Sequence, residues 1–196
     1  IKVHTVIHAN EGVPSDIKFT SAATNDSFML RPSALNKGDI ITMDRAYIDY
    51  EKLETLTQRE VLYVTKMKKN LKYNIIEDCM YQTDKGLMEV RIQNVTFSKM
   101  LKDGTIMIHH ARIITYVDIK KHKLVSLLTN DMESEPHEII EIYRKRWEIE
   151  LLFKQIKQNF PLKYFYGESA NAIKIQIWVT LIANLLLMVM KKGLTR

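Results

Sequence analysis

The chain has 196 residues, 46% of them hydrophobic, and a formal net charge of +6 with an isoelectric point near 9.2. This length suits one domain, or one domain with an insertion, and the composition supplies enough apolar residues for a core. Cys79 is the single cysteine, which excludes an intrachain disulfide and makes a reducing cytosol the expected compartment. The basic excess is compatible with a polyanionic partner, but charge alone favours an ordinary basic soluble protein.

The first third of the chain alternates between strand-like and helix-like patterns, separated by turn residues such as Gly12 and Pro14. Strands are predicted within 1–9, 15–22, 37–44 and 61–67, and helices within 25–35 and 49–61. Asn25 or Asp26 is the expected cap of the first helix. The order strand, strand, helix, strand, helix, strand predicts a mixed α/β fold.

Residues 70–128 change to a β-rich pattern. Strand-like runs occupy 73–82, 87–97, 105–117 and 123–129. Turn sequences separate them at Asp84-Lys85-Gly86 and at Lys102-Asp103-Gly104. We therefore expect an antiparallel β insertion in this region.

The remaining residues are predicted to be helical. Ser134 is a plausible cap for a helix with Pro136 in its first turn, and this helix should end before Pro161. A last helix is expected from about residue 168 to 192, closed by Gly193.

The apolar stretch 175–190 within this last helix is shorter than the roughly 20 residues that span a bilayer. Gln176, Thr180 and Asn184 interrupt it at helical spacing. A buried core helix is the expected structure, rather than a membrane segment.

Residues 143–157 combine polar side chains with an apolar stripe. Read as one helix of about 100° per residue, the segment places Tyr143, Arg146, Glu150 and Lys157 within an arc of roughly 60°. The adjacent apolar stripe consists of Ile142, Ile149, Leu152, Phe153, Ile156 and Phe160. This pattern predicts a helix that carries a charged, partly buried site beside the core.

Two carboxylates are candidates for chemistry, and each has an ordinary structural alternative. Glu150 is expected at the border of the core, whereas Glu148 points roughly 160° away, to the solvated face. The alternative for Glu150 is a salt bridge within the helix to Arg146 or Lys154. Asp44 ends a strand, where ligands usually bind in open α/β sheets, but a turn or capping aspartate is the commoner case.

The spacing Tyr143-x2-Arg146-x3-Glu150-x6-Lys157 resembles the signature of the DDE transposases that bacterial insertion sequences encode. Further blocks resemble the same family in the same order: TMDRAY, YVTKMKKN, LLTND, RWEIELLFKQIKQNF and ESANAIKIQIWVTLIANLLL. Ala46 departs from the pattern, since glycine is common there. The resemblance covers almost the whole chain.

This resemblance implies an RNase H-like core, a mixed sheet with flanking helices, with an all-β insertion before the glutamate-bearing helix. The implied divisions are the first part of the core without its first strand at 1–69, the insertion at 70–128 and the C-terminal helices at 129–196. It also implies three acidic residues that hold two Mg²⁺ ions, with Mn²⁺ as an alternative. Asp44 and Glu150 would be two of these ligands, and the third is expected upstream of Ile1.

Chemistry explains this ligand set, because two metals can stabilise the attacking and the leaving oxygen of a phosphodiester, and Mg²⁺ prefers carboxylate ligands. By resemblance, Tyr143, Arg146 and Lys157 hold the transposon-end strand. Arg146 can bind a phosphate bidentately and Lys157 can act as a point charge.

The partners implied are DNA, as transposon ends and target, and a second copy in a homodimer on DNA. A membrane is not expected, nor is a nucleotide cofactor, because the sequence has no Walker motif or dinucleotide fingerprint. The implied location is the bacterial cytoplasm, in association with the nucleoid.

Two other functions remain open. One is an RNase H-like nuclease of another process, although the Tyr-Arg-Glu-Lys set favours a transposase. The other is a non-catalytic DNA-binding or dimerising remnant, because the strand with the family's first aspartate would precede residues 1–9 and is not present. We expect that this chain cannot transpose DNA alone.

Overall fold

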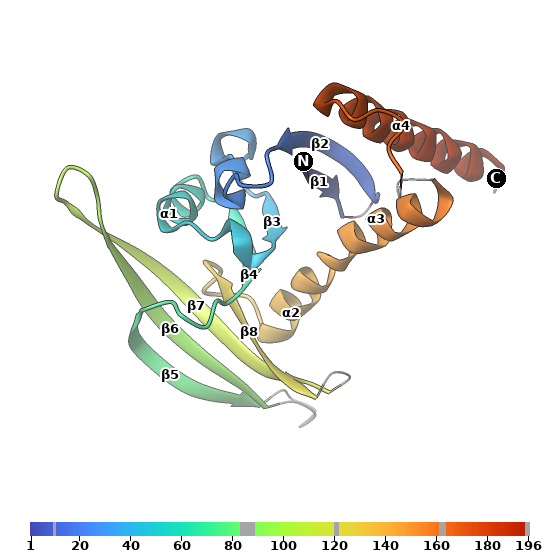
Figure 1. Cartoon of the computed structure of the whole chain (residues 1–196). Helices are drawn as coiled ribbons and strands as arrows, with labels where there is room; N and C mark the ends of the chain where they lie inside the picture. Colours follow the sequence, from blue (N-terminus) through green and yellow to red (C-terminus); the bar gives the residue numbers. More distant parts are fainter. Residues whose placement is uncertain (10, 83–88, 120–121, 161–163, 195–196) are drawn as a thin grey trace. The chain divides into compact units, whose positions relative to one another are not determined.

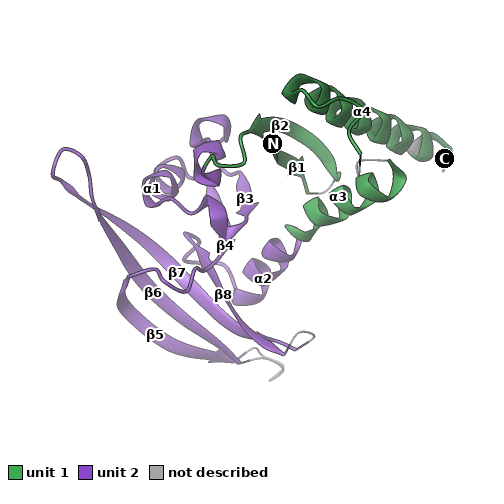
Figure 2. Cartoon of the chain, in the orientation of Figure 1, with its two compact units in different colours: residues 1–24, 146–196 green, residues 25–145 purple. Residues whose placement is uncertain are grey.

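The computed structural model describes residues 1–9, 11–82, 89–119, 122–160 and 164–194 (Figure 1). Two compact units, coloured separately in Figure 2, contain residues 1–24 with 146–196 (unit 1) and residues 25–145 (unit 2). The turn predicted at Asp84-Lys85-Gly86 lies outside the described residues. The division into a core and an insertion stays a prediction.

Unit 1 consists of an antiparallel hairpin and two helices. Its elements are β1 (Lys2–His8), β2 (Val13–Thr20), α3 (Trp147–Asn159) and α4 (Ala170–Leu194). Gly12 has a φ of +64°, a conformation that favours glycine, and its N–H donates to the His8 carbonyl at 2.8 Å. Leu152 and Ile156 of α3 are buried with Leu181 of α4 in a small core. The two strands predicted here are confirmed.

Helix α4 is buried along one stripe only. Thr180, Leu181 and Asn184 are each at most 6% exposed. Large apolar side chains elsewhere on the helix are exposed, among them Ile175, Val179, Ile182, Leu186 and Val189. By length and composition, residues 170–191 could cross a membrane, with a mean hydropathy of 1.9 and 17% of the apolar window buried.

Two predictions about this last helix are therefore corrected. Most of its surface is exposed, so it is not a buried core helix. Among the described elements of unit 1, the hairpin and α3 are available to cover it, and they bury one stripe. Gly193 does not close it either, since the helix continues to Leu194.

Unit 2 is built on a six-stranded mixed sheet. The strands are β3 (Ile40–Met43), β4 (Leu62–Lys66), β5 (Asn74–Gln82), β6 (Glu89–Met100), β7 (Ile106–Asp118) and β8 (Lys123–Thr129). Their order is β3-β4-β8-β7-β6-β5; β3 is parallel to β4, and the other described neighbours are antiparallel. All four strands predicted between residues 70 and 129 are confirmed. The mixed sheet with its helices is consistent with an RNase H-like core.

Both faces of this sheet carry apolar clusters, because side chains alternate between the faces along each strand. On one face, Val95, Phe97 and Ile113 pack with Leu53 and Leu56 of α1 (Tyr50–Gln58). On the other, the strands pack against α2 (Pro136–Arg144); this cluster comprises Val64, Val90, Ile92, Ile114, Tyr116, Val125, Leu127, Ile139 and Ile140. A helix thus covers part of each face of the sheet, while the edge strand β5 is largely exposed.

The single helix predicted over 25–35 is wrong. The structure has two short 3₁₀ turns instead, η1 (Asp26–Met29) and η2 (Pro32–Ala34). Pro32 lacks an N–H and disfavours a helical conformation at Arg31, which is extended with φ −119° and ψ 91°. The predicted cap is confirmed, since the Asn25 side chain accepts from the Ser27 N–H at 3.1 Å.

The cap of helix α2 lies one residue after the predicted cap, Ser134. Glu135 is the capping residue, and its N–H donates to the Glu138 carboxylate at 3.1 Å. The Ser134 hydroxyl donates instead to Asp131 at 2.6 Å, in the turn that precedes the helix. Pro136 occupies the first turn as predicted.

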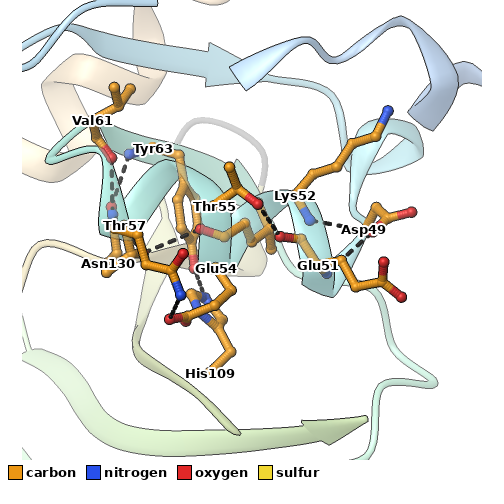
Figure 3. A network of polar contacts seen from close by, with 12 residues as sticks. Asp49, Glu51, Lys52, Glu54, Thr55, Thr57, Val61, Tyr63, His109 and Asn130 are labelled. Atoms are coloured by element: carbon orange, nitrogen blue, oxygen red, sulfur yellow. Dashed lines mark hydrogen bonds and ion pairs between the residues drawn. The ribbon is translucent and has the colours of Figure 1, made fainter. Parts of the chain in front are cut away.

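A buried polar network joins α1 and β4 to β7 (Figure 3). His109 has no exposed surface; its Nδ1 lies 2.8 Å from the Glu54 carboxylate and its Nε2 lies 2.7 Å from the Tyr63 hydroxyl. The Gln58 amide donates to the other Glu54 oxygen at 3.1 Å, and Asn130 accepts from the Tyr63 N–H at 2.9 Å. The partners of His109 are thus an acceptor on one side and a phenol on the other.

Burial sets the protonation of this network. Burial lowers the pKa of His109, and the Glu54 carboxylate opposes that effect without cancelling it. Burial also raises the pKa of Tyr63, with a further contribution from Glu54, so the phenol keeps its proton. A neutral His109 then donates from Nδ1 to Glu54 and accepts from Tyr63 at Nε2.

We expect the stability of unit 2 to fall as the pH drops below the usual histidine value of about 6.5. In that range the unfolded chain protonates residue 109 while the folded chain, with its lowered pKa, does not. The loss continues down to the folded pKa, with a slope of at most about 1.4 kcal/mol per pH unit. Urea unfolding between pH 8 and pH 5, compared with His109→Gln, measures this component; equal pH profiles for both proteins would contradict it.

Candidate active site

Asp44 follows the last residue of β3, at the carboxyl end of a strand that runs parallel to β4. Its side chain is exposed and caps the 3₁₀ turn η3 (Arg45–Tyr47), with Oδ1 accepting from the Ala46 N–H at 2.9 Å. The other oxygen, Oδ2, accepts no hydrogen bond from a described residue. Asp44 therefore has the capping role that the sequence left open, and one oxygen remains available.

A second acid acts on the same surroundings. Burial raises the pKa of Tyr47, and the charges of Asp26 and Asp44 raise it further, in that order. Asp26, which was not predicted as a site residue, therefore lies near enough for its charge to act on the Tyr47 phenol, as the charge of Asp44 does. Both acids belong to unit 2.

The signature segment is divided between two helices, so its interpretation as a single helix is wrong. Tyr143 lies in α2 and packs on the core of unit 2, whereas Glu150 and Lys157 lie in α3. Lys145 and Arg146 keep helical dihedral angles, but the Lys145 N–H donates to Ile142 and Tyr143, which tightens the turn. The apolar pattern continues through this break, which is why the sequence did not indicate it.

Glu150 forms the intrahelical ion pair that was its structural alternative. Its Oε1 accepts from Nη2 of Arg146 at 2.6 Å, with side-chain exposures of 41% and 20% respectively. Oε2 of Glu150 accepts no hydrogen bond from a described residue. Glu148 was expected on the solvated face, but its side chain is half-buried, like that of Glu150.

An open pocket on unit 1 brings two of the predicted residues together. Glu150 and Lys157 both line it, with Phe153, Lys154 and Gln158. These residues follow Glu150 at three, four, seven and eight positions, the spacing that places side chains on one face of a helix. The pocket therefore combines one carboxylate with two lysine cations.

Part of this pocket was not predicted from the sequence. Phe153 was placed in the core stripe, and Lys154 was considered only as a salt-bridge partner of Glu150. The stripe itself is confirmed at Leu152 and Ile156, which are buried. The spacing from Glu150 was the signal that could have identified Phe153, Lys154 and Gln158 as its neighbours.

The donor atoms suit a hard divalent cation. Asp44 and Glu150 each offer a carboxylate oxygen that no described residue uses, and oxygen is the ligand that Mg²⁺ prefers. Groups of three or more acidic, histidine or cysteine side chains that could hold a metal are absent from the described residues. Asp44 and Tyr143 belong to unit 2, and Arg146, Glu150 and Lys157 to unit 1.

Comparison with known proteins gives a consistent result. The family described as "Transposase DDE domain" matches residues 1–186. Among curated proteins, the chain is 27% identical over 187 residues to y4zB of Sinorhizobium fredii, named as a transposase, covering 95% of this chain and 52% of that protein.

Two further relatives are named as transposases of insertion sequence elements. The one for IS4SA of Synechocystis is 26% identical over 190 residues, and the one for IS5377 of Geobacillus stearothermophilus is 23% identical over 195 residues. Each alignment covers 95% of this chain, and 52% and 48% of the two relatives. The chain thus spans about half the length of the curated relatives it matches.

Proposed function

The chain belongs to the transposase DDE domain family, and we propose that it is the catalytic part of a transposase that breaks and joins phosphodiester bonds at the ends of an insertion sequence. The observation that carries the proposal is the family match over residues 1–186, together with Glu150 beside Arg146 and in one pocket with Lys157. We propose DNA, as element ends and target, for its substrate.

The family generally uses a divalent metal. We propose that Asp44 and Glu150 hold Mg²⁺, as two ions with a third acidic ligand from outside this chain. Bound cations of this kind offset charge on the attacking and leaving oxygens of a phosphodiester. The support is the chemistry of the two carboxylates and their unused oxygens.

The remaining residues of the signature have roles that follow from their chemistry. Arg146 donates to Glu150, which fixes the carboxylate and offsets its charge near a polyanionic strand. Lys157 places a cation in the same pocket, where it can attract a DNA phosphate. Tyr143 can donate its hydroxyl to a phosphate oxygen or pack on a sugar. We propose that these three residues position the transposon-end strand.

Assembly and location are proposed on the same basis. DNA ends are paired during transposition, so we propose a homodimer on DNA. The protein would act in the bacterial cytoplasm, at the nucleoid. A nucleotide cofactor has no role in this chemistry.

We expect the protein expressed from its whole reading frame to cleave duplexes that carry the element's terminal sequences in the presence of Mg²⁺. Removal of the metal with EDTA should abolish cleavage, and added Mn²⁺ should restore it. Gel analysis of labelled duplexes with and without the terminal sequences gives the measurement. Equal cleavage of both duplexes would favour a nuclease of another process, and cleavage of neither a non-catalytic remnant.

A further inference from the structure

The segment that joins β4 to β5, residues 67–73, crosses one face of the sheet of unit 2 and is called the strap below (Figure 1). Met67 and Leu71 pack against the cluster that contains Phe97, and the Met67 N–H donates to the Ser126 carbonyl at 2.8 Å. The Tyr73 ring lies 5.8 Å from the Phe97 ring, at an interplanar angle of 55°. Met67, Leu71 and Tyr73 thus anchor the strap to the sheet.

The lysines of the strap lie between these anchors. Lys69 and Lys72 are exposed, Lys68 is half-buried, and none of the three forms an ion pair with a described residue. Together with Lys66, at the end of β4, they give residues 61–76 four positive charges and no negative charge, compared with +6 for the whole chain.

Carboxylates on the elements around the strap already have partners of their own. Asp78 of β5 accepts from the Arg91 Nε at 2.9 Å. Glu51 of α1 pairs with Lys99 at 2.8 Å, and Glu54 with His109 at 2.8 Å. The cations of Arg91 and Lys99 offset the charges of Asp78 and Glu51, whereas Glu54, bonded to a neutral His109, and Glu77, which accepts from the Asn94 amide at 2.8 Å, keep theirs. The four lysines of residues 61–76 outnumber these two acids, so the strap keeps a net positive charge.

We propose that the strap is a docking surface for the phosphate backbone of duplex DNA, in addition to the signature residues of unit 1. This inference rests on the proposed function, which makes DNA the polyanion that the protein meets. Flexible lysines act as point charges and read no bases, so the strap contributes affinity without sequence preference. The apolar anchors fix the backbone of the strap, so binding to DNA costs less conformational entropy there.

The test is binding of the chain to a fluorescein-labelled 30-base-pair duplex of arbitrary sequence, in EDTA, at several salt concentrations. Each phosphate neutralised contributes about 0.9 to the slope of log K against log salt, so Lys68→Gln, Lys69→Gln and Lys72→Gln together should reduce the slope by up to roughly 2.7. Affinity at 0.1 M salt should fall by at least about tenfold. The matched control removes three other lysines of unit 2, Lys37, Lys102 and Lys123, and should change the slope less.

An equal loss of DNA affinity in both triple variants would overturn the proposal, because the loss would then reflect the net charge of the protein and not the position of the lysines. Binding to phosphatidylserine vesicles that depends on the strap, with DNA binding unchanged, would overturn it in favour of a membrane surface. Acetylation of the wild-type chain avoids any question of folding: DNA should protect Lys68, Lys69 and Lys72 more than the control lysines. This test measures binding and not cleavage. A wild-type protein that binds DNA through the strap but never cuts DNA would therefore contradict the proposed function and leave the strap proposal standing.

Discussion

Replacing Glu150 with Gln should abolish DNA cleavage and leave DNA binding nearly unchanged. The amide keeps the size of the side chain but loses the negative charge that a divalent cation requires. In the protein expressed from its whole reading frame, we expect cleavage of terminal duplexes in Mg²⁺ to slow by at least about 1000-fold, which corresponds to roughly 4 kcal/mol in the activation barrier. Binding should persist, because the cations of Arg146 and Lys157 remain.

Glu148→Gln is the matched control for this experiment. It is the same chemical change two residues earlier, in the same first turn of α3, at a side chain that is also half-buried. We expect this variant to cleave at close to the wild-type rate. Cleavage by Glu150→Gln at the rate of Glu148→Gln would show that residue 150 is only a salt-bridge partner.

Phe97→Ala should destabilise unit 2 by about 3–5 kcal/mol, the usual cost of removing a fully buried aromatic side chain. Phe97 has no exposed surface and contacts the rings of Tyr50, Tyr73 and His109, with centroids 4.9, 5.8 and 6.4 Å away. Its removal leaves a cavity where α1, the strap and β7 meet. Urea unfolding followed by circular dichroism measures the loss.

Phe28→Ala provides the comparison, because the ring of Phe28 is 72% exposed. Its described contact is with the Lys52 ammonium, 5.9 Å from the ring centroid, and an exposed cation–π contact contributes about 0.5–1 kcal/mol. We therefore expect a loss of no more than about 1 kcal/mol for this variant. A similar loss for both variants would contradict the packing role assigned to Phe97.

The strands of this protein were predictable because their signal is local. Alternating apolar residues and turn sequences identified β5 to β8, and the run before Asp44 identified β3. Helix boundaries were harder to place. Pro32 should have indicated a break within 25–35, but the divide at Lys145 and Arg146 follows from a change in hydrogen bonding that leaves no composition signal.

The candidate site was predictable as a set of residues but not as a set of contacts. Spacing alone placed Glu150 near Arg146 and Lys157. In the structure Glu150 forms an ion pair with Arg146 and lines a pocket with Lys157. The closeness of Asp26 to Tyr47 could not be predicted, since it depends on how two 3₁₀ turns pack. The exposure of α4 was also missed, because hydropathy measures the tendency to be buried and does not identify the surface that buries it.

The cap formed by Asp44 determines how this residue can be studied. Alanine would remove the bond to the Ala46 N–H as well as the charge, and the loss of such a cap typically costs about 1 kcal/mol. An inactive alanine variant would thus mix a folding defect with a chemical one. Asparagine is the isostere that keeps an oxygen for the cap, so it separates the two jobs of this side chain.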